Sequence, residues 1–385
     1  MKLNFNKFFC TIKLKSYIPI SYAIISSMVF APYVSNYNSI ILEDKSVIQT
    51  SVKETKFTQL PLYDIYESLL NEVDGTEIYF VENINNLDNE TPWNGNIQID
   101  SLPVFINKYK LSENIDINKM KNQILKIGKS FGVNINQNQI LKTIINENSQ
   151  EITCTIDKNK KDNCLKISYK TDKIRISVNA DLSASVEFIE PLALPNGYGY
   201  SIYPTYEQLK NTGDYIKDNH KNLLMMENPT VDICKKGYDT YKNQIFSLEF
   251  YDKGQDVKDA NINYGLKRVR IYCDNNSITY IRFNSFDLTD KLGDYPIISA
   301  KKARETAVKG NLHNPFLNNP NSEKDIIKTE LTYLEYHNQE VLMPFYKIYV
   351  KSQNENYAYS KELGLTECSI CYIPAVDEKY LIYSY

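Results

Sequence analysis

Alternating apolar and polar residues mark two strands near the C-terminal end of the chain. They are Ile326–Tyr333 and, after a proline, Phe345–Val350. A repeat of two residues is typical of a half-buried antiparallel strand. Ser299 is a good N-cap for the Ala- and Lys-rich run that precedes them, and that run ends near Gly310. The pattern predicts a helix followed by antiparallel strands.

Two similar units are predicted earlier in the chain. In the first, Asp116 caps a helix that ends at Gly128 or Gly132, and in the second, Thr205 caps a helix that reaches about Leu224. The strands expected to follow are Glu151–Ile156, Cys164–Tyr169, Ile174–Val178 and Ser185–Phe188 in the first unit, and Gln244–Tyr251, Leu266–Cys273 and Thr279–Phe283 in the second. Asp274–Ser277 has the composition of a hairpin turn. Three such units predict an α+β array.

The segment before these units has a mixed pattern. Residues 36–60 are polar and irregular, as in a stalk, whereas Gln59–Val73 has apolar residues at helical spacing and Ile78–Val81 has the composition of a short strand. We therefore expect a stalk with one helix and one strand.

The N-terminus has the pattern of a membrane anchor. Residues 1–15 carry four lysines and no acid, and Tyr17–Val34 contains no charged residue. About 18 such residues can just span a bilayer as a helix, and preceding positive charge places the N-terminus inside. A cleaved signal peptide begins in the same way. An uncleaved anchor is the preferred interpretation, because Pro32 follows Ala31 and no clean cleavage site is present.

Composition agrees with a folded body rather than a disordered one. The chain has 385 residues, of which 42% are hydrophobic and 24% charged, and its net charge is -3. Its length exceeds that of one ordinary domain, and its charge does not suggest a nucleic-acid footprint. The predicted organisation is a cytoplasmic N-terminus (1–15), a transmembrane anchor (16–35), a stalk and N-terminal helix/strand region (36–100) and three α+β modules (101–190, 191–290 and 291–385).

Six of the seven cysteines follow the predicted anchor. Cys154 and Cys164 flank a polar, turn-forming run, and in a hairpin centred near Asn159 they would lie opposite each other, close enough for a disulfide. Cys368 and Cys371 have the spacing of a redox motif. Their run is strand-like, however, so they are interpreted as two independent strand cysteines.

Two aromatic sites are candidates for ligand binding. The loop 194–204 contains two glycines together with Tyr198, Tyr200 and Tyr203, which could stack on a sugar or a peptide. The same rings could instead pack on their own sheet. Trp93, in a turn-forming segment, has the same two interpretations.

The sequence contains no recognisable catalytic constellation. His220, His313 and His337 are far apart, and Glu330 and Glu335 are poorly placed for an acid–base pair. Asp252, Asp256 and Asp259 lack the spacing of a calcium loop and are interpreted as a solvated loop. We expect no catalytic residue, no metal site and no cofactor.

Three segments resemble a known group of proteins. Tyr295–Ala303, Met343–Tyr349 and Cys371–Val376 look like the ectodomain ending of single-span envelope proteins of Gram-positive bacteria, similar to PepSY-like modules and to the YycH/YycI regulators of an essential sensor kinase. The likeness covers Asn261–Tyr380 well and Leu102–Phe250 loosely. It implies tandem helix-plus-antiparallel-sheet modules that bind other envelope proteins and modulate kinases or proteases, and it supplies no catalytic residue.

The leading functional hypothesis is therefore a non-enzymatic regulatory protein, anchored in the cell membrane with its C-terminal ectodomain outside, that acts on another envelope protein. The alternatives are a secreted peptidase-accessory or inhibitory module and a glycan- or peptide-binding envelope protein. An envelope hydrolase is the least favoured reading.

Overall fold

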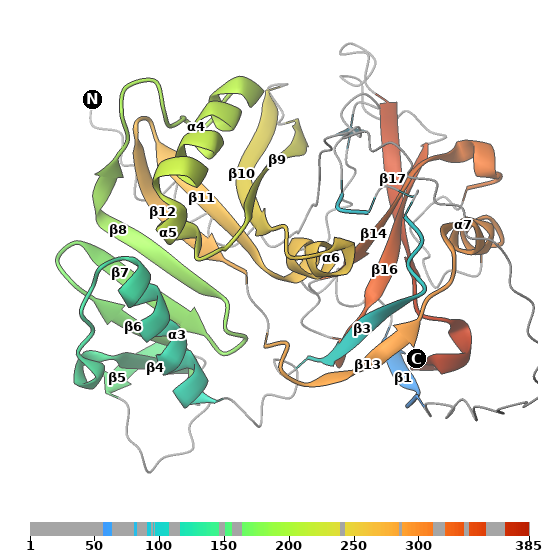
Figure 1. The fold of residues 1–385 in the computed structure, drawn as a ribbon, viewed down its shortest axis with the longest axis horizontal. Coiled ribbons are helices and arrows are strands. Elements are labelled where there is room, and N and C mark those ends of the chain that lie inside the picture. The colour runs from blue at the N-terminus through green and yellow to red at the C-terminus, as the bar shows by residue number, and fades with distance from the viewer. Residues whose placement is uncertain are drawn as a thin grey trace, which may run out of the picture.

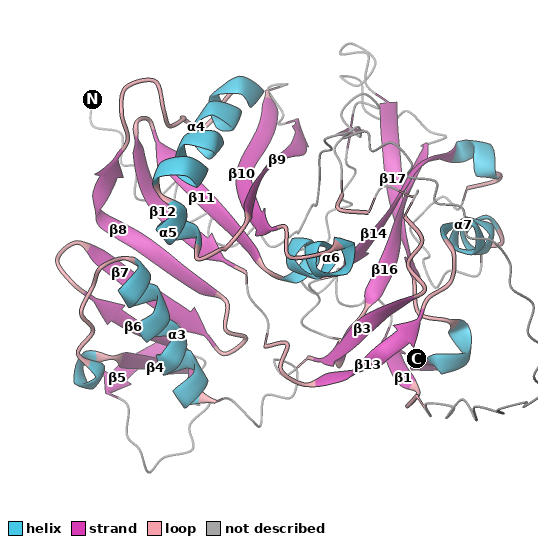
Figure 2. Ribbon diagram, viewed as in Figure 1, coloured by secondary structure: helices cyan, strands magenta, loops and turns pink. Residues whose placement is uncertain are grey.

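The computed structural model describes residues 57–63, 81–82, 91–93, 95, 97–107, 116–145, 151–155, 164–238, 243–284, 287–310, 320–334, 339–351 and 366–384. These residues form an α+β structure with mostly antiparallel sheets, which confirms the predicted class. They are arranged in two lobes, seen on the left and right of Figures 1 and 2, with helix α6 (Val257–Leu266) between them.

A nine-stranded antiparallel sheet forms the first lobe. In spatial order its strands are β5 (Glu151–Thr155), β4 (Leu141–Ile145), β6 (Cys164–Lys170), β7 (Ile174–Asn179), β8 (Ala184–Ala193), β12 (Ser277–Phe283), β11 (Arg268–Asp274), β10 (Gln244–Asp252) and β9 (Pro229–Tyr238). The turn predicted at residues 274–277 joins β11 to β12 and is confirmed.

Helices cover one face of this sheet (Figure 2). They are α3 (Ile117–Ser130), α4 (Tyr206–Asn219) and the short α5 (Lys221–Leu224). Asp116 and Thr205 cap the first two through hydrogen bonds from backbone N–H groups, as predicted. Apolar side chains of α3 and α4 join alternate strand residues in one continuous core. The predicted second helix is broken at His220, which separates α4 from α5.

The second lobe contains three smaller sheets. Their strands are β14 (Ile326–Tyr333), β16 (Pro344–Lys351), β17 (Thr366–Pro374) and β2 (Val81–Glu82) in the first sheet, β13 (Lys291–Pro296), β3 (Ser101–Ile106) and β15 (Val341–Leu342) in the second, and the parallel pair β1 (Leu60–Tyr63) and β18 (Leu381–Ser384). Helix α7 (Ala300–Val308) packs on the first sheet, and Ser299 caps it as predicted.

Strand β16 is more deeply buried than its sequence pattern predicts. Every residue from Pro344 to Val350 is buried, so both of its faces are covered. On one face Tyr346 and Ile348 pack under α7 with Ala303 and Ala307. On the other face Lys347 is buried, and Phe345 packs with residues of β1, β3 and β13. The prediction of two strands is confirmed, whereas the half-buried character holds only for the first part of β14.

The first lobe is inserted into the second. All of its elements lie between β3 and β13, and these two strands pair with each other in the second lobe. The structure therefore divides the chain differently from the predicted modules. The predicted boundary at 190/191 falls within β8, and β8 pairs with β12, so both predicted modules share one sheet. Residues 101–106, assigned to the first module, belong to the second lobe.

Two further elements correct the sequence interpretation. Residues 60–63, predicted to start a helix, form β1, because their backbone pairs with the last strand of the chain. The acidic segment 252–259, predicted to be a solvated loop, contains the start of α6, whose N-cap is Asp256. The Asp256 carboxylate accepts hydrogen bonds from the backbone N–H groups of Lys258 and Asp259.

The membrane anchor predicted at residues 16–35 lies outside the described part of the chain. Within that part, no helix combines the length and the hydropathy needed to cross a membrane.

A close contact between α6 and β14 yields a first prediction. A methyl group added at Gly265 would lie 2.7 Å from Cβ and 2.9 Å from the backbone nitrogen of Tyr333. We expect Gly265→Ala to lower the free energy of unfolding by about 1–3 kcal/mol because of this overpacking, although alanine favours a helix. Urea unfolding measures the change. Lys258→Ala in the same helix is the control and should change stability by less than about 0.5 kcal/mol; equal or greater stability of Gly265→Ala would contradict the prediction.

Candidate functional site

The tyrosine loop largely packs on its own sheet. The ring of Tyr198 lies against that of Tyr215, with centroids 4.3 Å apart. The Tyr200 hydroxyl donates a hydrogen bond to the backbone carbonyl of Ile271, and burial raises the pKa of Tyr200. Tyr203 is 50% exposed and Ile202 81% exposed. The structure does not gather the three tyrosines on one surface, and ligand binding at Tyr203 stays a prediction.

The structure does not form the hairpin on which the predicted disulfide depended. Strand β4 lies between β5, which carries Cys154, and β6, which carries Cys164. Cys154 pairs with Lys142, and Cys164 pairs with Ile144. The backbones of β5 and β6 are therefore two strand spacings, or about 9–10 Å, apart. A disulfide tolerates a Cα separation of only about 7 Å. The expected pairing therefore loses its geometric basis.

Four other cysteines are described, and all are free thiols. Cys368 and Cys371 are buried in β17 without forming a disulfide, which agrees with two independent strand cysteines. Burial raises the pKa of both Cys273 and Cys371 to about 12. Because the thiolate is the reactive form, these two cysteines are poor nucleophiles.

Of the histidine and glutamate candidates, only His220 and Glu330 lie in the described part of the chain. Burial lowers the pKa of His220, which lies between α4 and α5, whereas His313, His337 and Glu335 lie outside the described residues. Glu330 is fully buried in β14. In the described part of the chain, no group of three or more His, Cys, Asp and Glu side chains could hold a metal ion.

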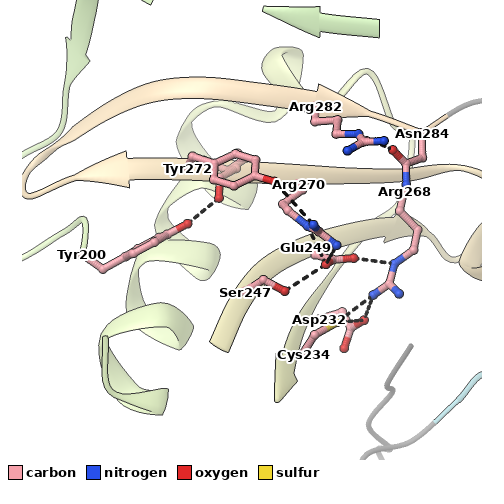
Figure 3. A network of polar contacts seen from close by, with 11 residues as sticks. Tyr200, Asp232, Cys234, Ser247, Glu249, Arg268, Arg270, Tyr272, Arg282 and Asn284 are labelled. Carbon is pink, nitrogen blue, oxygen red and sulfur yellow. Dashed lines mark hydrogen bonds and ion pairs between the residues drawn. The ribbon is translucent and has the colours of Figure 1, made fainter. Parts of the chain in front are cut away.

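A network of buried charges crosses β9, β10 and β11 on the face opposite α4 (Figure 3). Its central residue is Arg268, which forms ion pairs with Asp232 and, at 2.9 Å between Nε and Oε2, with Glu249. Arg270 donates from Nε to the Glu249 carboxylate at 2.7 Å. Glu249 lies directly across the ladder from Asp232 on one side and Arg270 on the other. The strand register alone therefore brings these charges together.

The network continues toward the second lobe. The Arg268 guanidinium lies 4.8 Å from the centre of the Tyr264 ring in α6. The buried Tyr264 hydroxyl has no hydrogen-bond partner among the described residues, and its pKa is raised by burial and by the charges of Asp232 and Glu330. Glu330 accepts a hydrogen bond from the Tyr349 hydroxyl and pairs with Lys328 at 2.7 Å. Carboxylates from both lobes thus lie near one helix.

This network is a structural feature rather than an active site. Asp232, Glu249 and Arg268 are each no more than 6% exposed, so a substrate has no access to them. Burial raises the pKa of Asp232 to about 7, and the nearby Glu249 and Glu330 add to this shift, while Arg268 opposes it. Paired buried charges of this kind contribute little net stability, but they penalise every arrangement in which one partner is lost.

An open groove lies in the second lobe, beside the N-terminus of α7. Its volume is about 870 Å³, near the upper end of the range of about 300–1,000 Å³ for ligand pockets. We call it the α7 groove. It is lined by Trp93, Gly95, residues 97–100, residues 297–301, Arg304, Glu323, residues 326–329 and Tyr346.

Aromatic and branched apolar side chains shape the α7 groove. Trp93 is only 5% exposed and packs edge-to-face on Tyr346 at a centroid distance of 5.8 Å. Its indole nitrogen donates a hydrogen bond to the carbonyl of Ile97 at 2.7 Å. The Tyr346 hydroxyl donates to the carbonyl of Ile298 at 2.7 Å. These contacts fix the wall before any ligand arrives. Trp93 is thus both a core residue and part of a candidate binding site.

The charged side chains of the groove are not equally available. Lys328 contributes to the lining, yet its ammonium pairs with Glu330, which lies two residues further along β14 on the same face of the strand. Lys301 lies 4.0 Å from Glu305, and both are largely solvated. Arg304 has neither an ion pair nor a hydrogen bond among the described residues. The groove therefore offers one guanidinium without an ion pair, beside a wall of mixed apolar and polar side chains.

No protein-family model, no curated protein and no solved structure gives a significant match to this chain. The fold and the two sites must therefore be interpreted from their own chemistry.

The charge network yields a second prediction. Arg268→Gln removes the cation that Asp232 and Glu249 share, and we expect it to lower the free energy of unfolding by about 3–5 kcal/mol. Arg175→Gln removes the exposed partner of Glu187 and serves as the control, with an expected loss below about 1 kcal/mol. Urea denaturation compares the two variants. Similar small losses would show that the buried pairs do not stabilise the observed arrangement.

A third prediction concerns pH. The native pKa of Asp232, about 7, exceeds the unfolded value of about 3.9, so between these values the native state binds the proton that the unfolded state has lost. Stability contributed by this group falls as pH rises from about 4 to about 7. The free energy of unfolding of the wild type should therefore fall between pH 5 and pH 7.5 relative to that of Asp232→Asn. A constant difference would contradict the raised pKa.

Proposed function

We propose that this protein is a membrane-anchored extracytoplasmic interaction protein without catalytic activity, which regulates another envelope protein and docks it through the α7 groove. The observation that carries the proposal is the groove itself, because it is preformed, partly apolar and bordered by an unpaired charge. The charge-free segment at residues 17–34 supports the anchor.

The arrangement of α7 also supports the proposal. A helix followed in the chain by the antiparallel strands β14, β16 and β17 is the unit that the resemblance to PepSY-like modules implies for residues 291–385. The groove opens at the N-terminal end of that helix, where β14 begins. Docking at this place would leave the first lobe free, so one partner can bind without disturbing the larger sheet.

Site-specific photo-crosslinking in intact cells tests the docking surface and is our fourth prediction. Ile97 lines the groove and is 39% exposed, whereas Ile189, in β8 of the other lobe, is 42% exposed. A benzophenone amino acid at position 97 should form an adduct with one membrane or extracytoplasmic protein, and the same group at 189 should not. Deletion of the chain should then change the kinase or protease output of that partner. Equal adducts from both positions, or none from position 97, would contradict docking in the groove.

Topology is tested separately by labelling cells with a membrane-impermeant thiol reagent after reduction and by measuring the N-terminal mass of the membrane-bound chain. Labelled ectodomain cysteines on a chain that begins at Met1 support the anchored regulator. A shortened, released chain would favour the secreted accessory module, and labelling only after lysis would exclude an extracytoplasmic role.

A further inference from the structure

We propose that the α7 groove binds an extended segment of the partner protein in which apolar residues flank one carboxylate-bearing residue, and that Arg304 holds this carboxylate. This inference rests on the proposed docking function and adds the chemistry of the occupant. It follows from the shape of the groove, from the side chains of its wall and from the balance of its charges.

The shape of the groove suits an extended chain. Two non-helical stretches of this protein line it, residues 97–100 and residues 326–329 of β14. Residues 97–100 lead directly into β3, and the carbonyl of Asp100 accepts a hydrogen bond from the backbone nitrogen of Ile297. Extended backbone exposes N–H and C=O groups at regular intervals, so a peptide can add to it as another strand, with pockets for alternate side chains.

Isoleucine is the most frequent residue of the groove lining. Ile97, Ile99, Ile297, Ile298, Ile326 and Ile327 all line the groove. Ile97 is 39% exposed, and Ile99, Ile297, Ile298 and Ile326 are partly buried against the core beneath α7. An occupant with apolar side chains would complete their burial, and the backbone polar groups of an extended peptide could meet the polar side chains that also line the groove, such as Gln98, Ser299 and Thr329.

The charges select an acidic residue. Arg304 and Tyr346 both line the groove, and the Arg304 charge opposes the burial that raises the pKa of Tyr346 to about 12. The Tyr346 hydroxyl already donates its hydrogen bond to the carbonyl of Ile298. No carboxylate among the described residues pairs with Arg304, so the Arg304 guanidinium can form a bidentate contact with an incoming carboxylate. The groove lining also contains two carboxylates, and neither pairs with Arg304. The Asp100 carboxylate accepts a hydrogen bond from the Gln98 side chain at 2.7 Å, and Glu323 is exposed to solvent.

A displayed library of random decapeptides, panned against the full-length chain in detergent, tests the proposal. The bound pool should be enriched in peptides with Asp or Glu between apolar residues. Trp93 is the sole tryptophan of the chain and lines the groove, so its emission reports occupancy directly. A selected peptide and its Glu→Gln counterpart are then titrated, and we expect the Gln peptide to bind about tenfold more weakly, as for loss of a charged hydrogen bond.

Two variants of α7 complete the experiment. Arg304→Gln should bind the Glu and Gln peptides equally well, whereas Lys302→Gln, which removes an exposed charge of the same helix outside the groove lining, should keep the tenfold preference. An unchanged Trp93 emission spectrum without peptide shows that each variant is folded. A bound pool without acidic enrichment, no bound pool, or a preference that survives in Arg304→Gln overturns the proposal.

A failure of this inference can be distinguished from a failure of the proposed docking function. If position 97 forms an adduct with one envelope protein in cells but Arg304→Gln leaves that adduct and the peptide preference unchanged, docking stands and the acidic occupant is wrong. If position 97 forms no adduct, docking itself fails, whatever the peptides show.

Discussion

The arrangement of the two lobes depends on one guanidinium that is almost completely removed from water. Arg268 lies between two carboxylates of its own sheet and faces the ring of Tyr264, and the charge of Glu330, from the second lobe, also acts on that tyrosine. Desolvating these groups is costly, and their mutual attraction only offsets that cost when all of them are in place. The network therefore favours one arrangement of the lobes but adds little to the stability of the whole fold. The main favourable contribution to that stability is the burial of apolar surface.

Helix α6 and strand β16 are the elements that transmit this constraint. Buried residues occur on several sides of α6, including Ala260, Tyr264 and Gly265, because both lobes pack on it. The glycine allows the helix to approach the backbone of Tyr333. Strand β16 is buried on both faces, with α7 on one and β1, β3 and β13 against Phe345 on the other. The charge network and the α7 groove are consequently separated by little more than one sheet.

An element could be predicted from the sequence when the residues that cause it are close to one another in the chain. Capping residues such as Asp116, Thr205 and Ser299, and the alternation in β14, act over a few neighbouring residues and were readable in the sequence. Helix α6 was missed because an element buried on several sides has no single apolar face, so its first acidic residues resembled a solvated loop. The expected Cys154–Cys164 pairing failed because β4, distant from the hairpin pattern, occupies the intervening place in the sheet. The groove draws on segments between residues 93 and 346, and no local pattern could have assembled it.

The insertion of one lobe into the other has a consequence for the order in which the chain can fold. The elements of the first lobe are contiguous, so its sheet can form as soon as they have emerged. The second lobe cannot close until β18 has been synthesised, because β1 pairs with β18, and β3 must wait for β13. Such distant pairings fold slowly and leave apolar strands exposed meanwhile. In a protein made from its N-terminus, the part that carries the groove is therefore completed last, on a first lobe that is already formed.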